Sequence, residues 1–176
     1  MAYIHLPGFQ EMADDVRESL KALEEKMGEV GEISRMLALR PDIFRATTVI
    51  FKTLMVNKTE LDKEVKETLA ILISRENGCK VCVGEHERIA RMLGMPEERI
   101  NAVIEGLDKL EISEKERVLY RFCLRCAGKE NYKILREDVD AVRAAGYTDS
   151  QILEAVAIVG YFNYINTISN SLGAGK

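Results

Sequence analysis

The sequence predicts an all-α protein that forms a single domain. No segment shows sustained alternation of apolar and polar residues between turn residues, so no strand is predicted. Apolar residues instead recur at intervals of three and four, as in the stripe Met12, Val16, Leu20, Leu23 and Met27. Only 3 of the 176 residues are proline, the strongest helix breaker. A chain of this length is one domain by default, with residues 1–32 as an N-terminal helical extension of a core over 33–176.

Glycine, proline and polar caps bound the predicted helices of the first half. The first stripe ends at Gly28, and a short helix is expected over 33–39. Pro41 can open the next helix, which is apolar around much of its circumference and therefore predicted to be buried in the core or in an oligomer interface. Thr59 is a plausible N-cap for the fourth helix, which ends at Asn77-Gly78.

Two capping boxes mark the last two long helices. Ser113 with Glu116 begins a helix that reaches about Gly128, and Thr148 with Gln151 introduces a final helix that reaches about Leu172. The other elements expected in this half are a helix from near Cys79 to Leu93, one opened by Pro96, a connector over 129–136 and a short helix that ends at Gly146.

Charge and hydropathy argue against several kinds of partner. The net charge of -4 argues against nucleic acid, which attracts basic surfaces. The longest strongly apolar run, Ile152 to Ile165, is shorter than the roughly 20 residues that span a bilayer. The N-terminus lacks the pattern of a signal peptide. We therefore expect a cytoplasmic protein with no membrane partner. In that compartment a C-x-x-C is redox-active or metal-binding rather than a structural disulfide.

Reactive side chains are concentrated between Glu67 and His86. Cys79 and Cys82 are three residues apart, and His86 follows Cys82 by four, so a helix brings them onto one face. The Asn77-Gly78 break places both cysteines at a helix start, where free N–H groups and the helix dipole stabilise a thiolate. His86 can exchange a proton with Cys82, and two cysteines at this spacing can form a disulfide.

A carboxylate that orients the histidine would complete this arrangement. Glu67 is the candidate, because the turn at Asn77-Gly78 would fold its helix back against the cysteine helix. On spacing alone, Glu64 and Glu76 are rivals.

Other interpretations of the cysteines are a metal site and purely structural thiols. Cysteine and histidine are zinc ligands, but the motif supplies three ligands where structural zinc takes four. A second C-x-x-C, formed by Cys123 and Cys126, falls in the middle of a predicted helix with no histidine at the matching place, and core packing is its favoured role. Asn163 and Asn166, in the most apolar helix, either line the active-site pocket or bridge subunits.

The E-x11-C-x2-C-x3-H pattern of Glu67, Cys79, Cys82 and His86 resembles the signature of the alkyl hydroperoxidase D (AhpD)-like proteins of the carboxymuconolactone decarboxylase superfamily. The resemblance covers roughly residues 35–173, and the late segment is similar to the closing helices of the peroxidase-related branch. It implies an all-helical AhpD-like fold that forms homo-oligomers, often trimers or hexamers.

The resemblance also implies an antioxidant peroxidase without a cofactor, which reduces a hydroperoxide with electrons from a dithiol or protein donor. Cys82 would be the peroxidatic thiol, Cys79 the resolving one, and His86 and Glu67 the proton relay. Val81 stands where the best-studied members carry a histidine, so the proton relay would lack one of its proton-transfer groups. The alternatives are a metal-binding or thiol-sensing module and a non-redox enzyme like the decarboxylases, although the decarboxylase branch lacks the cysteine pair.

Overall fold

The computed structural model describes residues 2–176, and within that range the chain forms nine α-helices and no strand. The predicted all-α class is therefore confirmed. The helices are α1 (Asp14–Met27), α2 (Glu32–Ala38), α3 (Pro41–Phe51), α4 (Lys63–Glu76), α5 (Lys80–Met92), α6 (Glu97–Glu105), α7 (Glu114–Ala127), α8 (Arg136–Ala144) and α9 (Asp149–Leu172). A π-helical turn, Lys52–Val56, continues α3.

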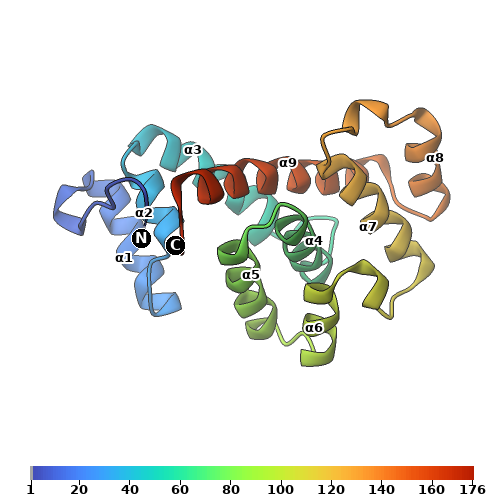
Figure 1. Ribbon diagram of the computed structural model, residues 1–176, viewed down its shortest axis with the longest axis horizontal. Helices are drawn as coiled ribbons and strands as arrows, with labels where there is room; N and C mark the ends of the chain where they lie inside the picture. The colour runs from blue at the N-terminus through green and yellow to red at the C-terminus, as the bar shows by residue number, and fades with distance from the viewer. Residues whose placement is uncertain (1) are drawn as a thin grey trace.

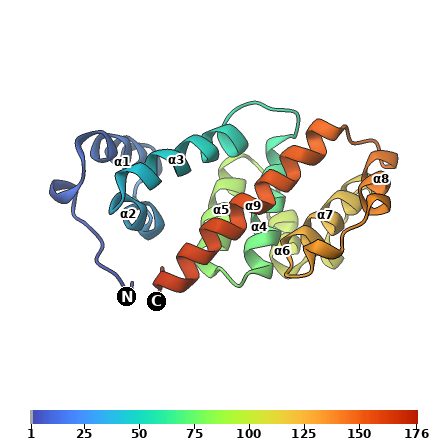
Figure 2. The same ribbon diagram turned by 90° about the horizontal axis from the view of Figure 1, so that it is seen from above.

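Helix α9 lies through the middle of the molecule (Figures 1 and 2) and packs against α2, α4, α5, α7 and α8. Its start is fixed by the predicted capping box, in which the Thr148 hydroxyl accepts from the Gln151 N–H. Helices α4, α5 and α6 lie along one side of it, and α7 and α8 lie at its N-terminal end. The main core forms where α4 and α7 pack on α9, around side chains such as Leu69, Leu119 and Ile158, which are fully buried.

The final helix is longer than the apolar run that the sequence suggested. It has 24 residues, and by length and composition alone it could cross a membrane. In this fold, however, Ile158, Val159 and Phe162 pack into the main core, and polar side chains follow on the same helix. Such packing is typical of the central helix of a globular domain. The expected cytoplasmic location and the absence of a membrane partner stay predictions.

The N-terminal helices cover one end of α9. A small cluster joins Val16 and Leu20 of α1 to Ala38 and Phe44 of α2 and α3. The Tyr3 N–H donates to the Leu172 carbonyl over 2.8 Å, which ties the lead-in to the end of α9. The proposed division between an extension over 1–32 and a core over 33–176 stays a prediction.

The predicted cap of α4 is wrong. The N-cap is Asp62, whereas the Thr59 hydroxyl donates to the Glu154 carboxylate of α9. The same carboxylate lies 3.0 Å from Nζ of the buried Lys66. Because a carboxylate from a distant helix binds this hydroxyl, Thr59 anchors the connector before α4 rather than capping the helix.

Helix α3 buries only part of its apolar surface within one chain. Phe44 is buried, but Ile43, Val49 and Ile50 are 37%, 64% and 45% exposed. One face of this helix is therefore buried within the chain, as the first of the two predicted possibilities requires. The other face stays a predicted subunit interface.

Candidate active site

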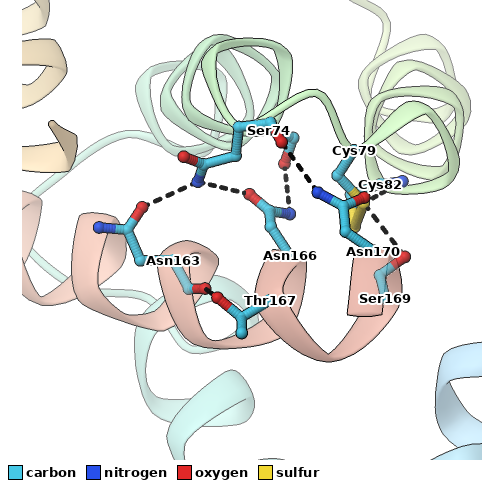
Figure 3. The surroundings of a disulfide bond; sticks show 9 residues. Ser74, Cys79, Cys82, Asn163, Asn166, Thr167, Ser169 and Asn170 are labelled. Carbon is cyan, nitrogen blue, oxygen red and sulfur yellow. Dashed lines mark hydrogen bonds between the residues drawn. A yellow bond between two sulfur atoms is a disulfide. The ribbon is translucent and has the colours of Figure 1, made fainter. Parts of the chain in front are cut away.

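A disulfide joins Cys79 and Cys82 at the start of α5 (Figure 3). Their Cα atoms are 5.4 Å apart, a usual separation for a disulfide. Cys79 is the N-cap residue, and its sulfur accepts a hydrogen bond from the Cys82 N–H over 3.4 Å. The two residues are only 1% and 3% exposed and form a cluster with Ile165 of α9, against which Ile33 and Leu37 of α2 pack.

The turn between α4 and α5 sets the position of the cysteines. Asn77 ends α4 in right-handed helical geometry, and Gly78 follows with φ of 65°, which reverses the chain within one residue. Only glycine adopts this left-handed conformation without strain. The predicted stop signal therefore acts through the backbone freedom of Gly78.

Gly78→Ala is expected to destabilise the protein by about 1 kcal/mol, because alanine is strained at positive φ. Gly84→Ala is the matched control, since a Cβ at either position meets no atom within 4 Å. Gly84 lies inside α5, where alanine is favoured over glycine by up to about 1 kcal/mol. Urea unfolding should show a lower free energy of unfolding for Gly78→Ala and a higher one for Gly84→Ala than for the unaltered protein. Equal shifts would show that the turn does not depend on a glycine.

His86 and Glu67 meet between α5 and α4. Nδ1 of His86 lies 2.6 Å from Oε2 of Glu67, and both side chains are buried. The carboxylate accepts the Nδ1–H, which leaves Nε2 as the nitrogen free to exchange a proton. The Phe162 ring packs nearly perpendicular to the imidazole, with 4.8 Å between ring centroids, which further fixes the orientation of the imidazole. The structure thus pairs Cys79 with Cys82 and His86 with Glu67, and His86 follows Cys82 by one turn of α5.

The two rival carboxylates lie elsewhere. The Glu64 carboxylate is 48% exposed and lies 2.8 Å from the Arg99 guanidinium. Glu76 is exposed at the end of α4. Of the three candidates, Glu67 is therefore the one that contacts the histidine.

A ladder of amides on α9 holds the turn in place (Figure 3). The Asn77 side-chain NH₂ donates to Oδ1 of Asn163 over 2.8 Å and to Oδ1 of Asn166 over 2.9 Å. Asn166 in turn donates to the Ser74 hydroxyl, and the Asn170 amide donates to the Asn77 carbonyl. Asn163 and Asn166 were expected either in the active-site pocket or between subunits. Within this chain they connect α9 to the segment that carries Cys79.

Val81 faces the C-terminal residues. A Cβ built on Gly175 would lie 2.4 Å from Cγ2 of Val81, so the two residues are already in contact. Gly175 has φ of 72° and its N–H donates to the Glu32 carboxylate over 2.7 Å. A larger histidine at position 81 would have to displace this tail or point away from it.

A surface hollow of about 370 Å³ lies beside Cys79. Its lining includes Arg75, Lys80 and Glu87 as charged groups and Val83 and Ile104 as apolar ones. The hollow brings solvent close to the start of α5. No group of three or more His, Cys, Asp or Glu side chains within residues 2–176 is arranged to hold a metal ion.

Cys123 and Cys126 are free thiols that are buried in the main core, as the favoured role of core packing predicts. Both lie in the second half of α7, and Cys126 is next to its last residue, so the expected position in the middle of the helix is wrong for Cys126. Burial raises the pKa of the Cys123 thiol well above its usual range and raises that of Cys126 to about 11. A raised pKa leaves little thiolate at neutral pH, and the thiolate is the reactive form.

We therefore expect iodoacetamide at pH 8 to leave both α7 thiols unmodified in the folded protein. Labelling of Cys126 should rise as the pH approaches about 11, because its thiolate population grows toward that pKa. Trypsin separates the two sites into residues 122–125 and 126–129, so mass spectrometry can follow each one. Rapid labelling of Cys126 at pH 8 would contradict the effect of burial.

Known proteins resemble this chain in sequence and in fold. The model of the carboxymuconolactone decarboxylase family matches residues 41–122. An AhpD-core, peroxidase-related protein from Ralstonia eutropha JMP134 superposes with a TM-score of 0.91 and 27% identity, over 98% of this chain and 90% of that one. A peroxidase-related protein from Silicibacter sp. TM1040 has a TM-score of 0.90 and 21% identity over the same shares.

The debrominase Bmp8, solved in complex with 2,3,4-tribromopyrrole, has the same fold, with a TM-score of 0.76 and 20% identity over 92% of this chain and 85% of that one. No curated protein matches the chain. The predicted resemblance to AhpD-like proteins and the AhpD-like fold are confirmed.

Proposed function

The family model and the peroxidase-related structures support the placement of this chain in the AhpD/carboxymuconolactone decarboxylase superfamily, and on that premise we propose that it is a thiol-dependent peroxidase. The observation that carries the proposal is the Cys79–Cys82 disulfide at a helix start, one turn from a histidine that is bonded to a buried carboxylate. A peroxidase of this kind needs a nucleophilic thiol, a second thiol to resolve it and a proton relay.

The catalytic cycle begins with the reduced dithiol. His86 takes the proton of the Cys82 thiol, and the resulting thiolate attacks one peroxide oxygen. The O–O bond breaks, and the departing alkoxide takes this proton back from His86 to become an alcohol. Cys82 is left as a sulfenic acid. The Cys79 sulfur then attacks the Cys82 sulfur, the S–O bond breaks, and water leaves as the disulfide forms. An external dithiol or a protein thiol donor, which is oxidised in turn, reduces the disulfide and closes the cycle.

Glu67 and His86 serve the proton transfers of this cycle. The carboxylate holds Nδ1, and its negative charge stabilises the imidazolium that forms when Nε2 takes a proton. This role does not require a second histidine at position 81.

The surroundings of the sulfurs favour an organic hydroperoxide as the substrate. Ile33, Leu37 and Ile165 pack against the cysteine pair, so a substrate that reaches it meets apolar side chains. An alkyl or aryl hydroperoxide gains free energy by burying its carbon atoms there, whereas hydrogen peroxide has none to bury. We therefore expect faster oxidation by cumene hydroperoxide than by an equal concentration of hydrogen peroxide.

Thiol titration tests the proposal directly. One equivalent of cumene hydroperoxide should remove two thiols from the reduced protein. Tryptic mapping should then show residues 76–80 joined to residues 81–88 through a new disulfide, because cleavage after Lys80 separates Cys79 from Cys82. An unchanged thiol count, or a disulfide between Cys123 and Cys126, would contradict the assignment.

Two alternatives are separated by further observations on the same sample. Stoichiometric zinc held by Cys79 and Cys82 would favour a metal-binding module. An activity that survives alkylation of these thiols would favour a non-redox reaction like those of the decarboxylases.

A further inference from the structure

Ser169 of α9 contacts one of the two sulfurs. Its Oγ lies 3.2 Å from Sγ of Cys79, and both residues are 1% exposed (Figure 3). A disulfide sulfur carries no hydrogen, so the serine hydroxyl is the donor. A serine inside a helix commonly donates to the carbonyl four residues earlier. Within residues 2–176, the hydrogen-bond partner of this hydroxyl is instead the sulfur of a residue 90 positions away.

The sulfur of Cys79 therefore faces two donors. The Cys82 N–H approaches it from the first turn of α5, at 3.4 Å, and the Ser169 hydroxyl approaches it from α9. A neutral disulfide sulfur is a weak acceptor, whereas a thiolate carries a full negative charge and binds the same donors much more strongly. Both donors consequently favour the reduced state in which Cys79 is a thiolate.

The position of Ser169 is fixed from two sides. Its carbonyl accepts the N–H groups that close the end of α9, from Gly173 and from Ala174. One residue further on, the Asn170 amide donates to the Asn77 carbonyl over 2.8 Å and so ties this turn of α9 to the turn before Cys79. The backbone that carries the Ser169 hydroxyl is thus held in place beside Cys79 by contacts on both sides.

We propose that Ser169 is a further catalytic residue, whose hydroxyl stabilises the Cys79 thiolate. This inference rests on the proposed function, in which the dithiol is reformed in every cycle. When a donor thiolate attacks the sulfur of Cys82, the S–S bond breaks and its electron pair moves to Cys79. The donor and Cys82 form a mixed disulfide, and Cys79 leaves as a thiolate that Ser169 and the Cys82 N–H stabilise. A second donor thiol then releases Cys82, and the donor leaves as a disulfide.

Ser169→Ala tests the proposal, with Ser171→Ala as the matched control. Ser171 lies on the same last turn of α9 but is exposed. In dithiothreitol buffers of graded oxidation, the equilibrium constant for reduction of the Cys79–Cys82 bond should fall about tenfold in Ser169→Ala, because a charge-assisted hydrogen bond is lost. Ser171→Ala should leave it unchanged, and Ser169→Thr, which keeps the hydroxyl, should restore most of it.

A second readout separates this chemical role from a structural one. In the reduced protein, the pH at which iodoacetamide labels Cys79 to half its maximal rate should rise by about one pH unit in Ser169→Ala, as follows from a tenfold effect. The midpoint for Cys82, followed on the neighbouring tryptic peptide, should stay within a few tenths of a unit. Unchanged Cys79 labelling, or equal shifts at both cysteines, would overturn the proposal.

Neither measurement uses a peroxide. A failure of the Ser169 prediction is therefore distinguishable from a failure of the peroxidase assignment, which the titration with hydroperoxide tests separately.

Discussion

Cys82→Ser is expected to lower the rate of hydroperoxide reduction by on the order of 10³-fold or more, because it removes the nucleophile that forms the covalent intermediate. A serine hydroxyl is not ionised at neutral pH and does not attack an O–O bond. Folding should be little affected, since serine is nearly isosteric and the disulfide is absent from the reduced enzyme. The measurement is consumption of cumene hydroperoxide with dithiothreitol as the electron donor.

Cys126→Ser is the control for this variant. Cys126 is also a buried cysteine in a C-x-x-C, but it is free and lies at the C-terminal end of α7. Its replacement should leave turnover within about twofold of the unaltered protein, since Cys126 lies on α7 and not on α4 or α5, which carry Cys82, His86 and Glu67. Loss of activity in both variants would indicate that the thiols act through stability rather than chemistry.

Cys79→Ser distinguishes the roles of the two sulfurs. Without a resolving thiol, Cys82 should still react with one equivalent of peroxide and then remain a sulfenic acid, which dimedone traps on residues 81–88. A trapped sulfenic acid on Cys79 in the Cys82→Ser variant, and none on Cys82 in Cys79→Ser, would exchange the two assignments.

Features determined by neighbouring residues could be predicted from the sequence. The capping boxes at Ser113 and Thr148 form as expected, because a cap involves only residues three positions apart. The turn at Asn77-Gly78 is likewise local, since it depends on the ability of Gly78 to adopt a positive φ. The spacing of Cys79, Cys82 and His86 on one helix follows from helical periodicity alone.

Features that depend on contacts between distant helices could not be predicted. Thr59 has the chemistry of an N-cap, but the Glu154 carboxylate, 95 residues away, takes its hydroxyl. The hydrogen bond between Ser169 and Cys79 likewise joins residues that are far apart in the sequence, and nothing near Ser169 indicates a sulfur partner. One signal was present: several asparagines and serines occur on one otherwise apolar helix, and buried polar groups require partners. The sequence shows that such partners must exist, but the packing of α9 on α4 decides which they are.

Glu67→Gln is expected to lower turnover by on the order of 10²-fold, the range typical of a general acid–base group. The substitution preserves the size of the side chain, and the glutamine oxygen can still accept the Nδ1–H of His86, so the fold should persist. What is lost is the negative charge that stabilises the imidazolium when Nε2 takes a proton. The effect should therefore appear in the rate of peroxide reduction and not in thermal unfolding.

Glu64→Gln provides the matched control for this prediction. Glu64 lies one turn earlier on α4, carries the same charge and pairs with Arg99 at the surface. Loss of an exposed ion pair should lower stability by at most about 1 kcal/mol. Because Glu64 pairs with Arg99 and not with His86, turnover should stay within about twofold of the unaltered protein. Similar effects in the two variants would mean that α4 supplies general negative charge rather than a specific partner for His86. A large effect confined to Glu67→Gln would identify the His86–Glu67 contact as the proton relay. Such a relay works although position 81 is a valine and not a histidine.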